Sequence, residues 1–198
     1  LDSINNIFVQ PQMGDGGLCL GAASLLNHSL GIHTKTMKDA YLGPQIEIEN
    51  SVCFDDPDLE IKNFSVVENP LCKDLLNGKV VGLVRGRMEF GPRALCNRSI
   101  LYKTSDNSIN DWLNKRMSRT EFMPFAPIVR EETASKAFKN FFTNDVTLKF
   151  MTSTISCSNE FAKKCPAVTH IDQTARPQVI KQSDNPFMWN VLKKWETI

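Results

Sequence analysis

The segment from Gly86 to Ser99 constrains the fold most, because it mixes charged and apolar side chains within one short stretch. Its three arginines are Arg87, Arg93 and Arg98. Apolar side chains favour burial, whereas guanidinium groups resist it unless an anion neutralises them. The apolar residues interleaved with the arginines are Met88, Phe90, Pro92, Ala94 and Leu95. This mixture predicts a packed loop whose arginines surround an anion, and the alternative is a solvated basic loop.

The chemistry of the arginine loop favours a phosphate ligand. Guanidinium groups bind phosphate oxygens in pairs, and each charge-assisted hydrogen bond contributes about 1.5–3 kcal/mol. Gly86 and Gly91 allow the backbone to approach such a ligand closely. The loop is therefore interpreted as part of a site for several phosphate oxygens.

Apolar periodicity predicts a mixed fold of the α/β (α+β) class, without internal repeats. The expected strands are residues 6–10, 80–84, 100–102, 126–129, 167–171 and 175–180. The expected helices are residues 18–30, 71–76, 108–116, 131–142 and a last segment that opens at Pro186. The arginine loop is thereby placed between two strands.

Composition excludes several functional classes. The net charge is +1, so the chain lacks the basic field that nucleic-acid binding uses, and no nucleic-acid or membrane partner is expected. No apolar stretch approaches the roughly 20 residues of a membrane span. The six cysteines form no CxxC pair. We therefore expect a protein of the reducing cytoplasm.

The arginine loop closely resembles the signature GRMEFGPRALGNRSI of the nodulation-type and antibiotic-type O-carbamoyltransferase family. The resemblance continues at residues 114–119, 124–127 and 166–176, and upstream at residues 8–11 and 14–18. Cys96 and Gln173 depart from the pattern, because the family usually has glycine at both positions. The resemblance extends over nearly the whole chain.

The resemblance implies a two-part architecture. Residues 1–41 are similar to the end of an ATPase-like first domain of the actin and sugar-kinase (ASKHA) type, contributing its last strand, turn and helix. Residues 42–198 are similar to a YrdC-like domain with a mixed twisted sheet and flanking helices. The last residues run out of a helical pattern, so we expect this second domain to be truncated at its C-terminus.

The resemblance also implies a reaction. In that family the second domain condenses carbamoyl phosphate, the carbamoyl donor, with ATP and Mg²⁺, releasing pyrophosphate and forming carbamoyl adenylate. The first domain then transfers the carbamoyl group to an acceptor hydroxyl beside a bound Fe(II). Small-molecule substrates and a possible homodimer follow from this likeness.

Candidate site residues are carried over by the same resemblance. The expected catalytic residues of the adenylate site are Arg87, Lys115, Arg119 and Arg176. Nucleotide-binding roles are expected for Arg93, Arg98 and His170, which would alternate with Asp172 along a strand. Asp15 resembles the metal-binding aspartate, although its histidine partners would come from a helix that this chain does not contain. The alternatives are a simple turn former at Asp15 and a polar strand edge at His170.

Two other functions compete with this interpretation. A YrdC-like module without its partner domain could bind nucleotide or RNA and catalyse nothing. A hydrogenase-maturation carbamoyltransferase shares the two-module plan, but its zinc-finger segments carry CxxC pairs that are absent here. A nodulation factor, an antibiotic sugar and a surface polysaccharide are all compatible acceptors.

Overall fold

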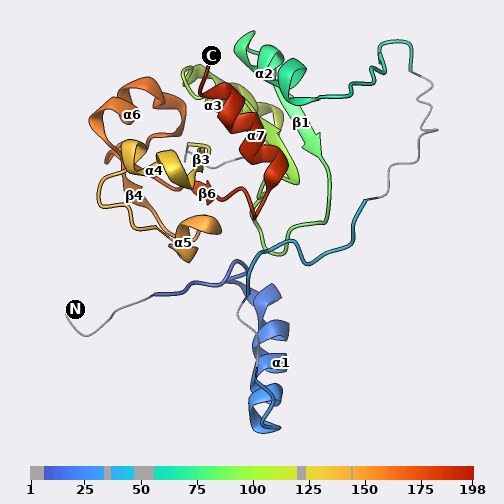
Figure 1. The fold of residues 1–198 in the computed structure, drawn as a ribbon, viewed down its shortest axis with the longest axis vertical. Helices are drawn as coiled ribbons and strands as arrows, with labels where there is room; N and C mark the ends of the chain where they lie inside the picture. Colours follow the sequence, from blue (N-terminus) through green and yellow to red (C-terminus); the bar gives the residue numbers. More distant parts are fainter. Residues whose placement is uncertain (1–6, 34–36, 47–55, 120–123, 144) are drawn as a thin grey trace.

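The computed structural model describes residues 7–33, 37–46, 56–119, 124–143 and 145–198. The chain forms a body of short helices and strands, from which the N-terminal helix α1 projects (Figure 1). The helices are α1 (Leu18–Ser29), α2 (Glu68–Leu76), α3 (Ser108–Arg116), α4 (Glu131–Ala137), α5 (Val146–Lys149), α6 (Asn159–Lys164) and α7 (Pro186–Trp195), with 3-10 turns η1 (Asp15–Gly17) and η2 (Pro166–Val168). The strands are β1 (Val81–Val84), β2 (Arg98–Leu101), β3 (Ile128–Arg130), β4 (Ile155–Ser156), β5 (Thr174–Ala175) and β6 (Gln178–Ile180).

The described strands pair into three two-stranded sheets. β1 and β2 are antiparallel, with Val84 opposite Arg98, and β4 and β5 are also antiparallel. β3 and β6 are parallel. The fold is thus α+β as expected, and the described strands form three separate two-stranded sheets where the resemblance implied one mixed sheet. The likeness to YrdC-like and ASKHA folds stays a prediction.

The parallel pair β3–β6 separates two hydrophobic cores. Ile128 and Ile180 pack into the first core, whereas their neighbours Val129 and Val179 pack into the second. Alternate side chains of a strand point to opposite faces, so one pair of strands serves both cores. The first core also contains α2, β2 and α7, and the second contains α4 and α5.

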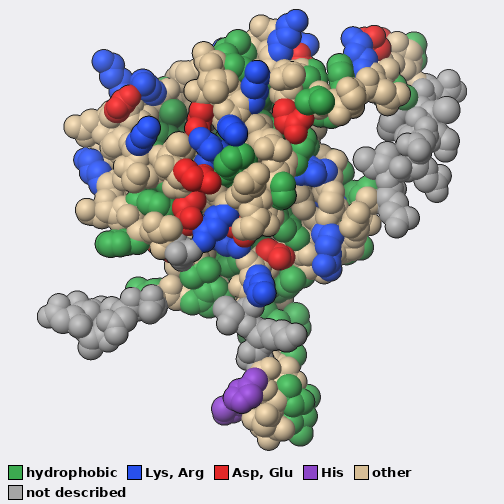
Figure 2. Space-filling model, in the orientation of Figure 1, with side chains coloured by type: hydrophobic (Ala, Val, Ile, Leu, Met, Phe, Trp, Pro, Cys, Tyr) green, Lys and Arg blue, Asp and Glu red, His purple; other side chains and the backbone are tan. Residues whose placement is uncertain are grey.

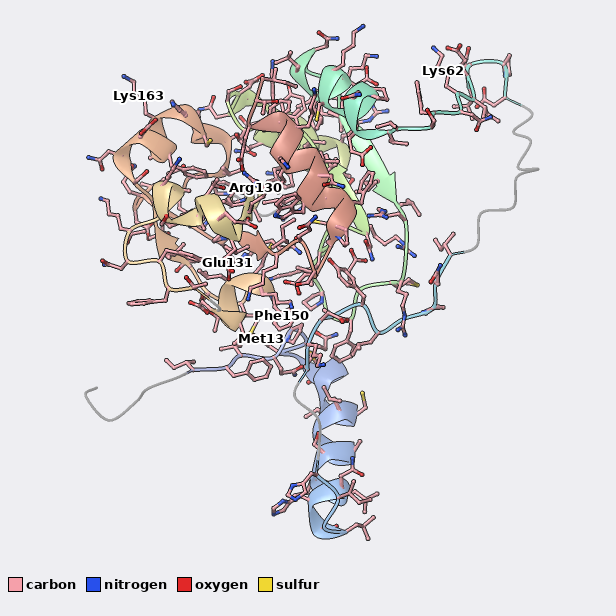
Figure 3. The ribbon with its side chains drawn as sticks, viewed as in Figure 1. Met13, Lys62, Arg130, Glu131, Phe150 and Lys163 are labelled. Atoms are coloured by element: carbon pink, nitrogen blue, oxygen red, sulfur yellow. The ribbon has the colours of Figure 1, made fainter. Side chains whose placement is uncertain are left out.

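A cluster of polar contacts links α7 and the residue that follows it to β3 and α4. Arg130, at the end of β3, donates two hydrogen bonds to the Glu196 carboxylate and lies 5.0 Å from the Trp189 ring centroid. Glu132 accepts the Trp189 indole N–H at 3.1 Å. Figure 3 labels Arg130 near the centre of the body and Lys163 on the outer helix α6. Asn185 caps α7 through its side-chain oxygen.

Helix α1 stands apart from the body. It buries none of its residues, and its sequence carries no Lys, Arg, Asp or Glu (Figure 2). A helix without a charged face is typical of protein interiors. In the described part of the chain, no helix has both the length and the apolar character that spanning a membrane requires.

The predicted helix at residues 131–142 is too long. α4 ends at Ala137 because Phe138 turns to extended backbone and bridges Cys157. Its ring is 2% exposed and lies 5.2 Å from the ring of Phe161. Tertiary packing of one phenylalanine therefore overrides the helical period, and Phe142 is left 73% exposed.

Two predicted strands are wrong. Residues 166–168 form η2 instead of a strand, because Ala167 donates its N–H to the Thr104 carbonyl and both Ala167 and Val168 are buried. Residues 7–10 are irregular, with Ile7 and Phe8 exposed. By contrast, helix 108–116 is confirmed at both ends.

The exposed turn at Gln173 carries backbone strain that glycine would relieve. Gln173 has φ of 65°, in the left-handed region. We expect Gln173→Gly to raise the free energy of unfolding by about 0.5–1 kcal/mol, since relief of strain exceeds the added entropy of the unfolded chain. Urea denaturation measures the change. Gln182→Gly, an exposed position without positive φ, is the matched control and should be neutral or destabilising; equal losses in both variants would contradict the strain.

Candidate anion site

The arginine loop connects β1 to β2 and folds around the carboxylate of Glu89. One oxygen, Oε1, accepts backbone N–H bonds from Leu95 at 3.0 Å, Asn97 at 2.7 Å and Arg98 at 2.9 Å. The Asn97 side chain adds a bond from Nδ2 to the Arg87 carbonyl at 2.8 Å. The loop is thus packed, as predicted, and not a solvated strand connection.

The side chains of Arg87 and Arg98 brace the backbone. Arg87 donates to the carbonyls of Leu42 and Gly43, each at 3.0 Å. Arg98 donates to the carbonyls of Arg85, Gly86 and its own neighbour Asn97. Guanidinium donors so engaged hold the loop shape.

Arg93 differs from the other loop arginines, because it lies beside Arg176 and lacks such partners. Nη1 of Arg93 and Nε of Arg176 are buried without a hydrogen-bond partner among the described residues. Desolvation, followed by the nearby Arg176 charge, lowers the pKa of Arg93. Two neighbouring guanidinium groups with unpaired buried donors form an arrangement that an anion would complete.

Both arginines line a cavity of about 1350 Å³. The lining of this cavity includes residues of both hydrophobic cores. Its apolar wall includes side chains of β2, α3 and α7, among them Leu101, Leu113 and Val191. Its basic side chains are Arg93, Arg98, Lys103, Arg119, Lys136, Lys164 and Arg176. Pockets for drug-sized ligands occupy about 300–1,000 Å³, so this cavity has room for a nucleotide together with a small second substrate.

Among the described residues, the two carboxylates that line the cavity are engaged by other cations. Glu160 pairs with Lys164 at 2.7 Å. Glu196 pairs with Arg130. Neither carboxylate is therefore free to serve as the counter-ion of the two arginines.

Of the other predicted residues, Arg98 and Arg119 also line this cavity. The guanidinium of Arg119 lies 5.0 Å from the Phe125 ring centroid. Lys115 lies in the last turn of α3, exposed and outside the cavity lining. Arg87 is also outside the lining.

His170 lies in a turn, so the interpretation that it alternates with Asp172 along a strand is wrong. The turn places Ile171 99% exposed, and His170 Nδ1 is 3.0 Å from the Thr174 hydroxyl. Asp172 accepts from that hydroxyl and from the Thr174 N–H, and these bonds lower the pKa of Asp172. The cluster closes the turn and does not line the cavity.

Asp15 opens η1 and is exposed. Among the described residues, no three His, Cys, Asp or Glu side chains gather as a metal site would require. One exposed carboxylate does not hold an iron ion, so no chemical step can be derived through a metal at this position.

Sequence reasoning missed a buried network behind the loop. Tyr41 donates its hydroxyl to the Leu95 carbonyl at 2.6 Å and accepts from Asn185 at 3.3 Å. Gln178 donates to the same Leu95 carbonyl at 3.4 Å. Burial raises the pKa of Tyr41, so its hydroxyl stays protonated. The sequence does show one acidic residue, Glu89, among the loop arginines, and this could have indicated an internal partner for the loop. No feature of the sequence indicates Tyr41 or Gln178 as parts of the network.

Comparison with known proteins identifies the family. Residues 72–198 match the profile described as "Carbamoyltransferase C-terminus". The chain belongs to this carbamoyltransferase family. It is 34% identical over 201 residues to nodulation protein NolO of Bradyrhizobium diazoefficiens, a match that covers 97% of this chain and 36% of that protein.

Other relatives give the same extent of similarity. The 3'-hydroxymethylcephem-O-carbamoyltransferase of Amycolatopsis lactamdurans is 32% identical, over 97% of this chain and 35% of that protein. Nodulation protein NolNO of Sinorhizobium fredii is 33% identical, over 94% of this chain and 28% of that protein. The chain thus spans about a third of the length of the curated relatives it matches.

The two departures from the carbamoyltransferase pattern have one structural feature in common. Cys96 and Gln173 both adopt positive φ, at 77° and 65°. This is the region that glycine enters without steric cost, so the backbone at both positions suits the glycine that the resemblance implies there.

If Arg93 and Arg176 bind an anion, removing one of the two charges should abolish anion binding without lowering the free energy of unfolding of the unliganded protein. Arg93→Met keeps the chain length of the side chain but removes one of two neighbouring charges. We expect the free energy of unfolding without ligand to stay level or rise by about 1 kcal/mol. At a hundredfold excess over its dissociation constant, pyrophosphate should add about 2.7 kcal/mol to the original protein, and this gain should vanish in the variant.

The matched control is Arg116→Met, on the exposed face of α3. It should keep the pyrophosphate gain. Denaturation curves with and without pyrophosphate measure both variants. An equal loss of ligand stabilisation in both variants would show that the anion binds elsewhere.

Proposed function

We propose that this chain provides the carbamoyl-adenylate-forming part of an O-carbamoyltransferase. The observation that carries the proposal is the pair Arg93 and Arg176, whose buried donors lack partners beside a cavity of about 1350 Å³. Membership of the carbamoyltransferase family supplies the reaction class. The cavity supplies charge and space for a polyphosphate together with a second, smaller acyl phosphate.

The proposed reaction consumes carbamoyl phosphate, ATP and one water. Water takes the place of phosphate on the carbonyl carbon, the carbon–oxygen bond to the phosphate breaks, and inorganic phosphate leaves. An oxygen of the resulting carbamate attacks the α-phosphorus of ATP. The bond to the β-phosphate then breaks, so that pyrophosphate leaves and carbamoyl adenylate remains.

The arginines act on charge that develops during these steps. Arg93 and Arg176 bind phosphate oxygens through donors that are already desolvated, which strengthens the interaction in the transition state. We expect Arg119, which also lines the cavity and lies over the Phe125 ring, to contribute a third cation. Arg98 stabilises the shape of the loop, since its guanidinium donates hydrogen bonds to backbone carbonyls of the loop.

The apolar part of the cavity suits a nucleotide base. Leu101, Leu113 and Val191 line this wall, and flat aromatic bases pack against such surfaces. Mg²⁺ would enter with ATP, held chiefly by the phosphates as is usual for nucleotide substrates, and would neutralise part of their charge. Fe(II) at Asp15 stays a prediction for a protein that supplies the further ligands.

The acceptor is proposed to be a hydroxyl group. This follows from the name of the relative from Amycolatopsis lactamdurans, an O-carbamoyltransferase of a hydroxymethyl group. Transfer to the acceptor, cytoplasmic location and a homodimer remain expectations of the full-length protein.

The full-length protein should release pyrophosphate from ATP only when carbamoyl phosphate is present. Arg176→Ala should lower kcat/KM for carbamoyl phosphate by about a hundredfold, because loss of one preorganised charged donor costs roughly 2.7–4 kcal/mol. A coupled pyrophosphate assay measures both quantities. Arg116→Ala on the exposed face of α3 should retain the original rate.

Two results would oppose the proposal. Pyrophosphate release that ignores carbamoyl phosphate would indicate a different adenylation. Binding of an oligonucleotide, without any turnover, would favour the non-catalytic module.

A further inference from the structure

Glu89 stands out in the arginine loop because its carboxylate is turned inward, toward the loop's own backbone. Its Oε1 accepts three N–H bonds, from Leu95 at 3.0 Å, Asn97 at 2.7 Å and Arg98 at 2.9 Å. No arginine side chain is needed for this arrangement. Glu89 therefore does more than balance charge: it determines the path of the backbone.

The backbone around Cys96 is shaped to hold this carboxylate. Successive N–H groups converge into an anion-binding nest when a residue in the right-handed region is combined with one in the left-handed region. Cys96, with φ of 77° and 1% exposed, supplies the left-handed residue. Its own N–H donates to the Ser99 hydroxyl at 3.1 Å, and the N–H groups of its two neighbours turn to the carboxylate. The anion in this nest is the side chain of Glu89, so the strained conformation of Cys96 and the inward carboxylate belong together.

The bonds between Glu89 and Leu95 close residues 90–94 into a bulge. The cavity is lined by the tip of this bulge, at Pro92, Arg93 and Ala94. The far end of the bulge is fixed independently, since Tyr41 donates to the Leu95 carbonyl at 2.6 Å. Both bonds anchor Leu95, and Arg93 in the bulge before it lies beside Arg176.

We propose that Glu89 is the positioning residue of the anion site, holding Arg93 beside Arg176 through the nest at residues 95–98. This inference deepens the proposed function and rests on it for the identity of the anion. Glu89 is not among the described residues that line the cavity, and in this proposal it acts through the backbone that carries Arg93.

The test compares Glu89→Ala with Glu89→Gln in the full-length protein, with pyrophosphate as the titrated anion. Alanine removes the acceptor, whereas glutamine keeps an oxygen that can accept the three N–H bonds without the charge. We expect alanine to raise the dissociation constant for pyrophosphate about tenfold or more, and glutamine to raise it by less than about threefold.

Two control variants separate positioning from general destabilisation. Leu148→Ala opens a hole in the second core, away from the cavity lining, and lowers the unfolding temperature without touching the loop. Glu60→Ala removes an exposed carboxylate paired with Lys62. Measured well below their unfolding temperatures, both controls should bind pyrophosphate as the original protein does.

Amide hydrogen exchange supplies a readout of the nest itself. Glu89→Ala should speed exchange at Leu95, Asn97 and Arg98, and glutamine should restore much of the protection. If Glu89→Ala binds pyrophosphate as tightly as the original protein while Arg93→Ala does not, the positioning role is refuted.

The outcomes also separate this inference from the proposed function. Suppose that the original protein binds pyrophosphate and Glu89→Ala weakens the binding, but ATP and carbamoyl phosphate yield no pyrophosphate. The positioning role then stands and the proposed reaction fails. If the original protein binds no pyrophosphate at all, both are overturned.

Discussion

Two like charges held side by side are the constraint on which the site depends. Arg93 and Arg176 come from distant parts of the sequence, and their mutual repulsion and desolvation oppose folding. Carboxylates at the cavity, Glu160 and Glu196, are engaged by Lys164 and Arg130. An anion bound between the two guanidinium groups, as proposed, would use donors that are already buried and would offset this cost.

The rest of the loop compensates for this strain. Arg87 and Arg98 donate to backbone carbonyls, and Glu89 collects three N–H groups, so the loop has a fixed shape before any ligand arrives. Preorganisation of this kind avoids the cost of ordering a charged loop during binding. The left-handed backbone of Cys96 contributes to this fixed shape, since the nest that binds the Glu89 carboxylate requires a residue in that conformation.

Local patterns predicted some features of the fold and site but not others. The loop between two strands and helix 108–116 are confirmed, because apolar spacing and turn residues determine them locally. The turn at His170 is closed locally by Asp172 and Thr174, and apolar spacing did not show it. The end of α4 depends on the contact of Phe138 with Cys157, which is distant in sequence and which no local pattern reveals. For the same reason the sequence identified an arginine-rich site but could not tell which arginines brace the backbone. Arg176, implied by resemblance, does line the cavity.

A crystal structure of the full-length protein with a non-hydrolysable ATP analogue tests the central claim most directly. The account predicts phosphate oxygens within hydrogen-bond distance of both Arg93 and Arg176, with the base against the apolar wall of the cavity. The Glu89 carboxylate should remain in its nest. Phosphates bound away from this arginine pair, for example at Lys115 on the exposed end of α3, would contradict the account.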